Sequence, residues 1–381
     1  MIGGGGSHSY YLAEGLLNRG VDLWVVSCKQ DNPLLPSNLP PRRFFQLDIN
    51  EFSLCHPPSS IAWKHLAQFV LSIGTLDIIH GHHYQGYHLG WMIRAILSKH
   101  GCRPRFVVTL HKTPPPMATP DFSSDPGFAF VYAISNSDPP DVLVANSNSF
   151  HRLLLSTQTK AARIRAIEHG VPTDFFASGA QQERPVDFEY VLCPVRVDPR
   201  KNLEDAVFGW KQVCAPRGVH LVITGTPGNR SPETRNTVER LKQRAGKHLK
   251  FLHFGDPRRS RRGRMIPFID MPKFLAHAAC CLFPSTSEGF GLAGLEALAA
   301  GVPLIAGDNE GVRQFVENGR NAILLVRERE KRRQQLVKHL NDLIAGKAIR
   351  LKLVKQGQKT AAEFSADAMA EKHVEAYLEG A

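Results

Sequence analysis

Two glutamates and two basic residues stand where they could bind a sugar and a diphosphate. Glu288 and Glu296 lie on either side of a glycine-bearing turn in the run FPSTSEGFGLAGLEALAAGVP, and Arg196 and Lys201 lie in the run VRVDPRKN. Carboxylates accept hydrogen bonds from vicinal hydroxyls, and two cations can neutralise a diphosphate leaving group. The plainer alternative is an ordinary turn with two surface acids, and two solvated cations in a basic stretch of chain.

The turn between the glutamates is expected to lead into a helix. An apolar run ends near Phe283, and a helical pattern begins near Leu292. The first turn of a helix leaves backbone N–H groups without intrahelical partners, so they can donate to phosphate or sugar oxygens.

The elements that position these residues follow an alternating pattern. In the first 175 residues we expect strands at 22–27, 76–80, 105–110 and 142–146, separated by helices at 7–19, 60–73 and 87–99. Ser7 is expected to cap the first helix, which buries Leu12 and Leu16. Short β-branched runs that alternate with amphipathic helices predict a parallel α/β sheet.

The same pattern restarts after the small polar segment 177–186, which suits a linker between domains. We expect strands at 190–195, 220–224, 249–254, 280–283 and 303–306, and helices at 203–213, 232–245 and 292–300. A last helix near 366–378 carries Met369, His373 and Tyr377 on one stripe. Two successive Rossmann-like domains, with the ligand where the carboxyl ends of their strands meet, are the simplest architecture.

The distribution of charge limits the classes of ligand that this protein is expected to bind. Residues 1–180 hold 14 Lys and Arg against 12 Asp and Glu, whereas residues 181–381 hold 33 against 23. A basic second half suits a polyanion, although the runs 258–264 and 327–333 read most simply as solvated charge. Since no aromatic residues are interleaved with these runs, nucleic-acid binding is not expected.

Seven cysteines without CxxC spacing indicate reduced thiols and a cytoplasmic protein. No apolar run is long enough to span a bilayer, and the first residues lack the pattern of a signal peptide.

The segment with Glu288 and Glu296 resembles the E-x7-E signature of retaining glycosyltransferases of the GT-B fold, family 4 (glycosyl transferases group 1). The resemblance implies that Glu288 holds the donor sugar and that Glu296 holds the ribose. It also implies a sugar and phosphate pocket lined by Gly289, Phe290, Gly291 and Leu292.

The segment with Arg196 and Lys201 resembles the G-R-L-x-x-x-K-G turn of the same family, in which both cations stabilise the departing diphosphate. Gly3 and Gly4 resemble the paired glycines of its first loop, whose backbone approaches the donor phosphates. The family has a strand before that loop, for which this sequence has no room. The sequence is therefore either truncated or lacks the leading strand.

Two histidine segments also resemble family motifs. His111 follows an apolar run as in the T-x-H element, which implies a position by the donor sugar and acceptor. The segment DIIHGHH resembles a D-x-x-H-x-H element, with His82 as an acceptor-side candidate. A metal bound by His80, His82 and His83 is not expected, because no carboxylate or cysteine completes the set.

Taken together, the resemblance implies a GT-B fold, with two Rossmann-like domains facing each other across a cleft. Residues 1–180 would form the acceptor domain and 186–362 the nucleotide-sugar domain, with 363–381 as a helix that packs back on the first. The implied reaction moves a hexose, with retention, from a nucleoside diphosphate sugar to a hydroxyl of a saccharide, small molecule or lipid-linked acceptor. No cofactor or metal is expected, since the chain has no Asp-x-Asp. At most a weak peripheral membrane contact is expected.

Two alternatives stay open. A GT-B-fold protein that binds sugar nucleotides with impaired turnover would fit the short N-terminus and the altered loop at 308–322, where Glu310 and Gln314 replace the family's glycine and glutamate. As a further departure from the family pattern, His169 stands where the family usually has asparagine. A dinucleotide-dependent oxidoreductase would fit the spacing of the N-terminal glycines, but no strand precedes them. The donor base, the sugar, the acceptor and the oligomeric state do not follow from the sequence.

Overall fold

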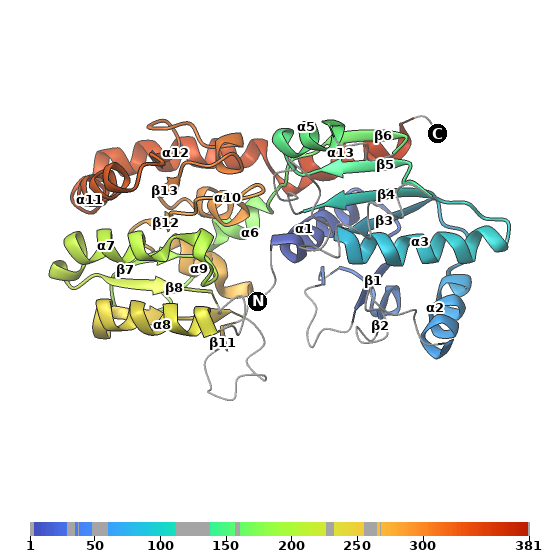
Figure 1. The fold of residues 1–381 in the computed structure, drawn as a ribbon, viewed down its shortest axis with the longest axis horizontal. Helices are drawn as coiled ribbons and strands as arrows, with labels where there is room; N and C mark the ends of the chain where they lie inside the picture. Colours follow the sequence, from blue (N-terminus) through green and yellow to red (C-terminus); the bar gives the residue numbers. More distant parts are fainter. Residues whose placement is uncertain are drawn as a thin grey trace. The chain divides into compact units, whose positions relative to one another are not determined.

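The computed structural model describes residues 4–28, 35–36, 38–47, 60–111, 138–156, 161–225, 232–254, 265–266 and 268–379. These residues divide into two compact units (Figure 1). The N-terminal unit comprises the described parts of Gly5–His169 and Asp367–Ala381, and the C-terminal unit comprises Gly4 and the described parts of Gly170–Ala366.

The N-terminal unit is built on parallel strands. Its larger sheet has the order β3-β4-β5-β6, with β3 at Ile78–His82, β4 at Arg105–Leu110, β5 at Val142–Ala145 and β6 at Arg163–Ala166. β1 (Val25–Cys28) and β2 (Phe44–Leu47) pair separately, and η1 (Pro41–Arg43) precedes β2. The β4 strand is buried along almost its whole length, which is typical of a parallel sheet covered on both faces.

Five α-helices of the described residues belong to this unit: α1 (Gly4–Asn18), α2 (Ser60–Ile73), α3 (His83–Lys99), α5 (Asn148–Ser156) and α13 (Ala366–Leu378). The core forms where α2, α3 and α5 pack on the strands, with Phe106, Tyr87 and Phe150 fully buried. The helix start expected at Ser7 is wrong. α1 already includes Gly4, so Ser7 lies inside the helix and is buried rather than capping it.

The C-terminal unit holds a six-stranded parallel sheet of order β14-β13-β12-β7-β8-β9. Its strands are β7 (Tyr190–Cys193), β8 (His220–Ile223), β9 (Leu249–Phe251), β12 (Cys281–Phe283), β13 (Leu304–Gly307) and β14 (Ile323–Leu325). A second, two-stranded sheet pairs β10 (His253–Phe254) with β11 (Met265–Ile266). The chain therefore runs outward from β7 to β9, returns to β12, and then runs outward in the opposite direction.

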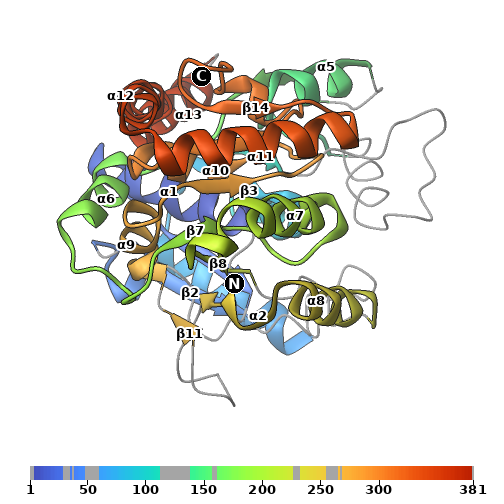
Figure 2. The ribbon, with the colours of Figure 1, turned by 90° about the vertical axis from the view of Figure 1, so that its left-hand side faces the viewer.

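Seven α-helices among the described residues of this unit connect and cover its strands (Figure 2): α6 (Thr173–Ala177), α7 (Leu203–Val213), α8 (Pro232–Ala245), α9 (Met271–Ala276), α10 (Leu292–Ala299), α11 (Arg329–Ala345) and α12 (Lys347–Glu363). Single 3-10 turns lie at η3 (Ser178–Gln181), η4 (Pro199–Lys201), η5 (Ala215–Arg217), η6 (Gly246–His248), η8 (Phe268–Asp270) and η9 (Val312–Gln314). α7 packs against α8 and α11, whereas α10 packs against α6 and α12.

The two units divide between His169 and Gly170, whereas the sequence suggested a linker at 177–186. Residues of that segment are ordered, because α6 and η3 pack on α9 within the C-terminal unit. The close fit is visible at Gly179, where an added Cβ would lie 2.3 Å from the backbone of Pro272.

Candidate functional site

The strand order of the six-stranded sheet indicates where a ligand would bind. β7 and β12 are neighbours, with Leu192 paired to Cys281, and the chain leaves them in opposite directions across the sheet. In open parallel sheets ligands bind beyond the carboxyl ends of the strands at this reversal of strand order. The segment with Arg196 and Lys201 follows β7 and the segment with Glu288 follows β12, so the structure brings both to the reversal point.

Lys201 and Glu288 are in direct contact there. The Nζ of Lys201 donates to Oε1 of Glu288 at 2.5 Å, and each side chain is 13% exposed. The Lys201 ammonium also lies 5.8 Å from the centre of the Phe283 ring, within the range of a cation–π contact. Lys201 and Glu288, which the sequence analysis assigned to two separate motifs, thus form one largely buried ion pair.

The turn after β7 is fixed by its own side chains. Asp198 caps η4 by accepting from the backbone N–H of Arg200 at 2.9 Å, and its carboxylate also accepts from the Arg200 guanidinium. These hydrogen bonds are the largest cause that lowers the pKa of Asp198. Asn202 then adopts a left-handed conformation with φ of 50°, which asparagine tolerates better than most residues, and α7 begins.

Hydrogen bonds hold this turn against the turn after β12. The backbone N–H of Thr286 donates to the carbonyl of Arg200 at 2.8 Å, and the Asn202 amide donates to the carbonyl of Pro284 at 3.4 Å. The relative placement of Lys201 and Glu288 is therefore set by backbone contacts as well as by the ion pair itself.

The loop with Gly289, Phe290 and Gly291 precedes α10, whose first residue is Leu292. Gly291 is the N-cap with a φ of 103°, a conformation that favours glycine. The loop after β13 supports this segment, since the Gln314 amide donates to the carbonyl of Gly289 at 3.4 Å. Gln314, which departs from the family's glutamate, thus contributes a neutral donor to the loop.

Gly311 allows the two loops to approach. An added Cβ at Gly311 would lie 2.6 Å from the carbonyl oxygen of Glu288 and 2.9 Å from the backbone nitrogen of Phe290. Sequence reasoning did not single out this glycine for close packing, although it noted the loop that carries it.

Glu296 and Arg196 are the other two residues that the sequence analysis predicted for this site. Glu296 lies inside α10 and is 6% exposed. Arg196 is half-buried after β7, and among the described residues it forms no hydrogen bond or ion pair. Its backbone lies against Gly225, where an added Cβ would meet the Arg196 Cα at 2.3 Å.

Two arginines of the run at 327–333 bind a buried carboxylate of α7. Asp205 of α7 is 1% exposed and accepts from Arg332 and Arg333, each at 2.7 Å. The interpretation of this run as solvated charge is therefore wrong for Arg332, which is buried, and for Arg333. The other basic run, 258–264, lies outside the described residues.

The N-terminal unit gathers the predicted histidines. His80 is held by the hydroxyls of Tyr377 at 2.7 Å and Thr109 at 2.8 Å, which accounts for both of its ring nitrogens. Nδ1 of His82 lies 3.4 Å from Nε2 of His111. His111 follows β4 and is partly exposed. Gly4 begins α1, and Gly3 lies outside the described residues.

Sequence reasoning missed His8 and gave no site role to His169. Both are buried next to His111, with ring centres 4.6 Å (His8 to His111) and 5.3 Å (His111 to His169) apart. The signal for His8 was its spacing, because it precedes Leu12 and Leu16 by one and two turns and so shares their buried face.

Five cysteines of the described residues carry free thiols: Cys102, Cys193, Cys214, Cys280 and Cys281. Within the described part of the chain, the helices are all too short or too polar to cross a bilayer.

Two family descriptions match successive parts of the chain. Residues 2–175 match Glycosyltransferase Family 4, and residues 175–360 match Glycosyl transferases group 1. The D-inositol 3-phosphate glycosyltransferases of Mycobacterium tuberculosis and Mycobacterium bovis are 25% identical over 313 residues, which cover 78% of this chain and 61% of theirs. The chain thus spans about three fifths of the length of these relatives.

Solved structures share the fold. The sucrose-phosphate synthase of Thermosynechococcus elongatus superposes with a TM-score of 0.69 at 21% identity, covering 96% of this chain and 90% of its own. Anabaena HepE in complex with UDP and glucose has a TM-score of 0.71 at 17% identity and covers 99% of this chain and 96% of its own. The two family matches together cover residues 2–360, so the chain belongs to the glycosyltransferases that they describe, and the solved structures show that it has the GT-B fold.

Proposed function

We propose that this protein is a retaining glycosyltransferase that moves a hexose from a nucleoside diphosphate sugar to a hydroxyl acceptor. The observation that carries the proposal is the Lys201–Glu288 pair at the reversal of strand order. Such a position suits a nucleotide ligand, and the pair offers both a cation for phosphate and an acceptor for hydroxyls.

The chemistry of the pair leaves capacity for a ligand. An ammonium has three N–H donors, so the contact with Glu288 leaves Lys201 two donors for diphosphate oxygens. The second carboxylate oxygen of Glu288 can accept from a sugar hydroxyl. In this proposal Arg196 shares the charge of the diphosphate, and Glu296 accepts from the ribose.

The loop before α10 supplies the remaining donor contacts in the proposal. The backbone N–H groups of Gly289, Phe290 and Gly291 lie just before α10, and that of Leu292 lies in its first turn, where the helix dipole favours negative charge. Gly3 and Gly4 are proposed to approach the phosphates as the family's paired glycines do.

The proposed step breaks the bond between the anomeric carbon and the diphosphate oxygen and forms the bond from that carbon to the acceptor oxygen on the same face. The acceptor proton passes to the departing phosphate, and the nucleoside diphosphate leaves. Fixed cations stabilise the leaving group, so the step uses no metal. His111 is proposed to hydrogen-bond near the reacting carbon, and His82 is a weaker candidate beside the acceptor.

Similar proteins suggest the first substrates to test. HepE is described with UDP and glucose, and the mycobacterial relatives act on D-inositol 3-phosphate. We therefore propose a UDP-hexose as the donor, and a small hydroxylated molecule as the first acceptor class.

The test is a thermal-shift panel of UDP-, GDP- and ADP-hexoses, followed by transfer assays with the stabilising donor. A ligand at 100 times its Kd stabilises the native state by about 2.7 kcal/mol, which gives a clear rise in Tm. Selective stabilisation together with an α-linked product from an α-linked donor supports the proposal. Stabilisation without transfer or donor hydrolysis would favour the sugar-nucleotide-binding alternative, and no stabilisation by any nucleotide sugar would contradict both.

A further inference from the structure

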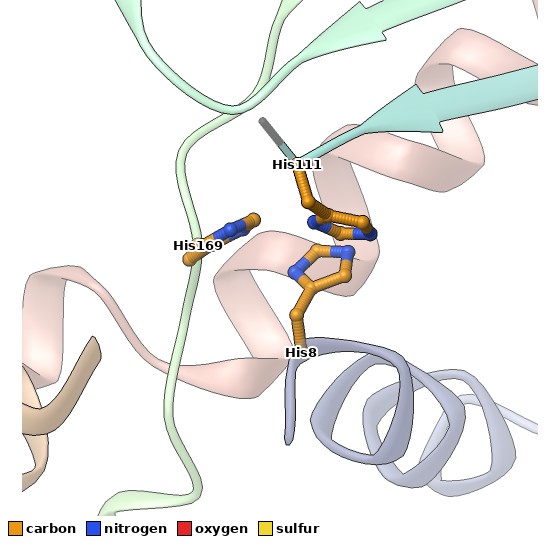
Figure 3. Close-up of side chains that lie close together, drawn as sticks. All are labelled: His8, His111 and His169. Carbon is orange, nitrogen blue, oxygen red and sulfur yellow. The ribbon is translucent and has the colours of Figure 1, made fainter. Parts of the chain in front are cut away.

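Three histidines from distant parts of the chain converge in the N-terminal unit (Figure 3). His8 comes from α1, His111 follows β4, and His169 follows β6. One ring nitrogen from each lies within 4.8 Å of those of the other two. The closest rings are those of His8 and His169, with centres 4.1 Å apart.

The burial of His8 needs an explanation. Its side chain is completely buried, and neither ring nitrogen has a hydrogen-bond partner among the residues that the structure describes. A neutral imidazole carries one N–H donor and one lone pair, and leaving buried polar atoms unpaired is unfavourable. His80 of the same unit shows the usual solution, since hydroxyls satisfy both of its nitrogens.

The electrostatics of the three histidines agree with their geometry. Burial, and next the neighbouring histidines, lower the pKa of His8 and His111, and burial lowers the pKa of His169 to about 3. The imidazoles are therefore neutral near pH 7. Each neutral ring carries one lone pair, and ring nitrogens of three histidines that lie within 4.8 Å of one another suit a metal cation.

We infer that His8, His111 and His169 bind one transition-metal dication of the zinc class. Three imidazoles are a sufficient protein ligand set for zinc, with a fourth position for water or another side chain. Zinc–nitrogen bonds of about 2.1 Å place tetrahedral ligand atoms roughly 3.4 Å apart. Two nitrogens at the full 4.8 Å span would have to approach each other by ~1.4 Å, a movement shared between two side chains.

Neighbouring groups support this geometry. The Asn146 amide lies 3.3 Å from Nε2 of His169 and 3.4 Å from the carbonyl of His111, so it ties two ligand segments together. His82 is close enough to His111 to approach the fourth position.

Occupation of the site has a consequence for the reaction, and this part rests on the proposed function. A metal-bound His111 cannot also hydrogen-bond near the reacting carbon through the coordinated nitrogen. Zinc is therefore an inhibitor of a transfer step that itself uses no metal.

The binding test is equilibrium dialysis of the chelator-treated full chain against Zn²⁺, with the bound metal quantified. Wild type is expected to retain one Zn²⁺ more than His8→Asn or His169→Asn. The second substitution introduces the residue common at that position in the family, so it should fold, which circular dichroism verifies. Bound zinc should show nitrogen neighbours at about 2.0–2.1 Å by X-ray absorption.

His220→Asn is the matched control. The rings of His220 and His248 are 5.0 Å apart in the C-terminal unit, so they form an imidazole pair outside the proposed site that could compete for zinc. This variant should keep the wild-type stoichiometry. Equal zinc binding by wild type and folded His169→Asn would overturn the inference, as would loss of the tight site in His220→Asn alone.

Activity gives a separate readout. Zn²⁺ at a concentration that fills the wild-type site should reduce transfer at least tenfold in wild type and less than twofold in His169→Asn. Zinc binding without inhibition would uphold the metal site and contradict the role of His111. Zinc binding by a protein that lacks transferase activity would uphold the site while the proposed function fails.

Discussion

Lys201 Nζ and Glu288 Oε1 lie 2.5 Å apart, although their residues are separated by 87 positions in the chain. Each follows one of the two adjacent strands, β7 and β12, from which the chain turns in opposite directions. A cation and a carboxylate are thereby fixed at the point where a parallel sheet is best suited to hold a nucleotide.

Replacement of Lys201 tests the cation of this pair. We expect Lys201→Ala to reduce kcat at least tenfold with the stabilising donor, about 1.4 kcal/mol of lost transition-state stabilisation. Lys211→Ala is the control, because Lys211 is an exposed lysine of α7. Steady-state kinetics measure both, and a Lys201→Ala enzyme with near-normal kcat removes this residue from the mechanism.

A double-mutant cycle tests whether Lys201 and Glu288 act as a unit. We expect Glu288→Gln to reduce kcat/KM strongly, since the amide keeps the shape but loses the charge. The double variant Lys201→Ala/Glu288→Gln should lose less than the sum of the single losses, with a coupling energy of about 1 kcal/mol or more. Strictly additive losses in kcat/KM would show that the two side chains act independently.

Replacement of Gly311 tests the close packing of the loop after β13 against the loop that carries Glu288. A Cβ at this position would lie 2.6 Å from the Glu288 carbonyl oxygen, so Gly311→Ala has to displace the backbone of the glutamate loop. We expect the free energy of unfolding to fall by about 1–3 kcal/mol and the donor-induced rise in Tm to become smaller. An unchanged donor response would mean that the loop tolerates the shift.

Asp205 tests the buried charge cluster of the C-terminal unit. Asp205→Asn leaves Arg332 and Arg333, which are 10% and 17% exposed, without their carboxylate. We expect a loss of about 3 kcal/mol in the free energy of unfolding at pH 7, measured by urea denaturation. Glu317→Gln is the control, because the pair of Glu317 with Arg320 is 62% exposed on both sides and should contribute less than about 1 kcal/mol.

The same carboxylate gives a pH dependence. Burial alone would raise the pKa of Asp205, but hydrogen bonds from Asn202, Arg333 and Arg332 outweigh it and lower the pKa. Its stabilisation is therefore present above the unfolded pKa of about 3.9 and is lost as the pH falls through the lower folded pKa. The stability difference between wild type and Asp205→Asn should shrink below about pH 4, and a constant difference would contradict this assignment.

Local patterns in the sequence determined much of the architecture. The spacing of apolar residues predicted the bounds of α2, α7, α8 and α13, and of β4, as observed. It did so because periodicity and chain punctuation are local properties. The motif residues Lys201 and Glu288 could be named from the sequence because each follows a recognisable strand.

Only the tertiary structure decided which of these residues meet. The order of strands brings Lys201 to Glu288, and the backbone of Gly311 to the same loop, because neighbours in a parallel sheet come from distant parts of the chain. The grouping of His8 with His111 and His169 arises in the same way, from a helix and two strand ends. The sequence also did not predict the start of α1, because a glycine-rich segment carries no periodic pattern. The burial of Ser7 and His8 depends on contacts that exist only in the folded unit.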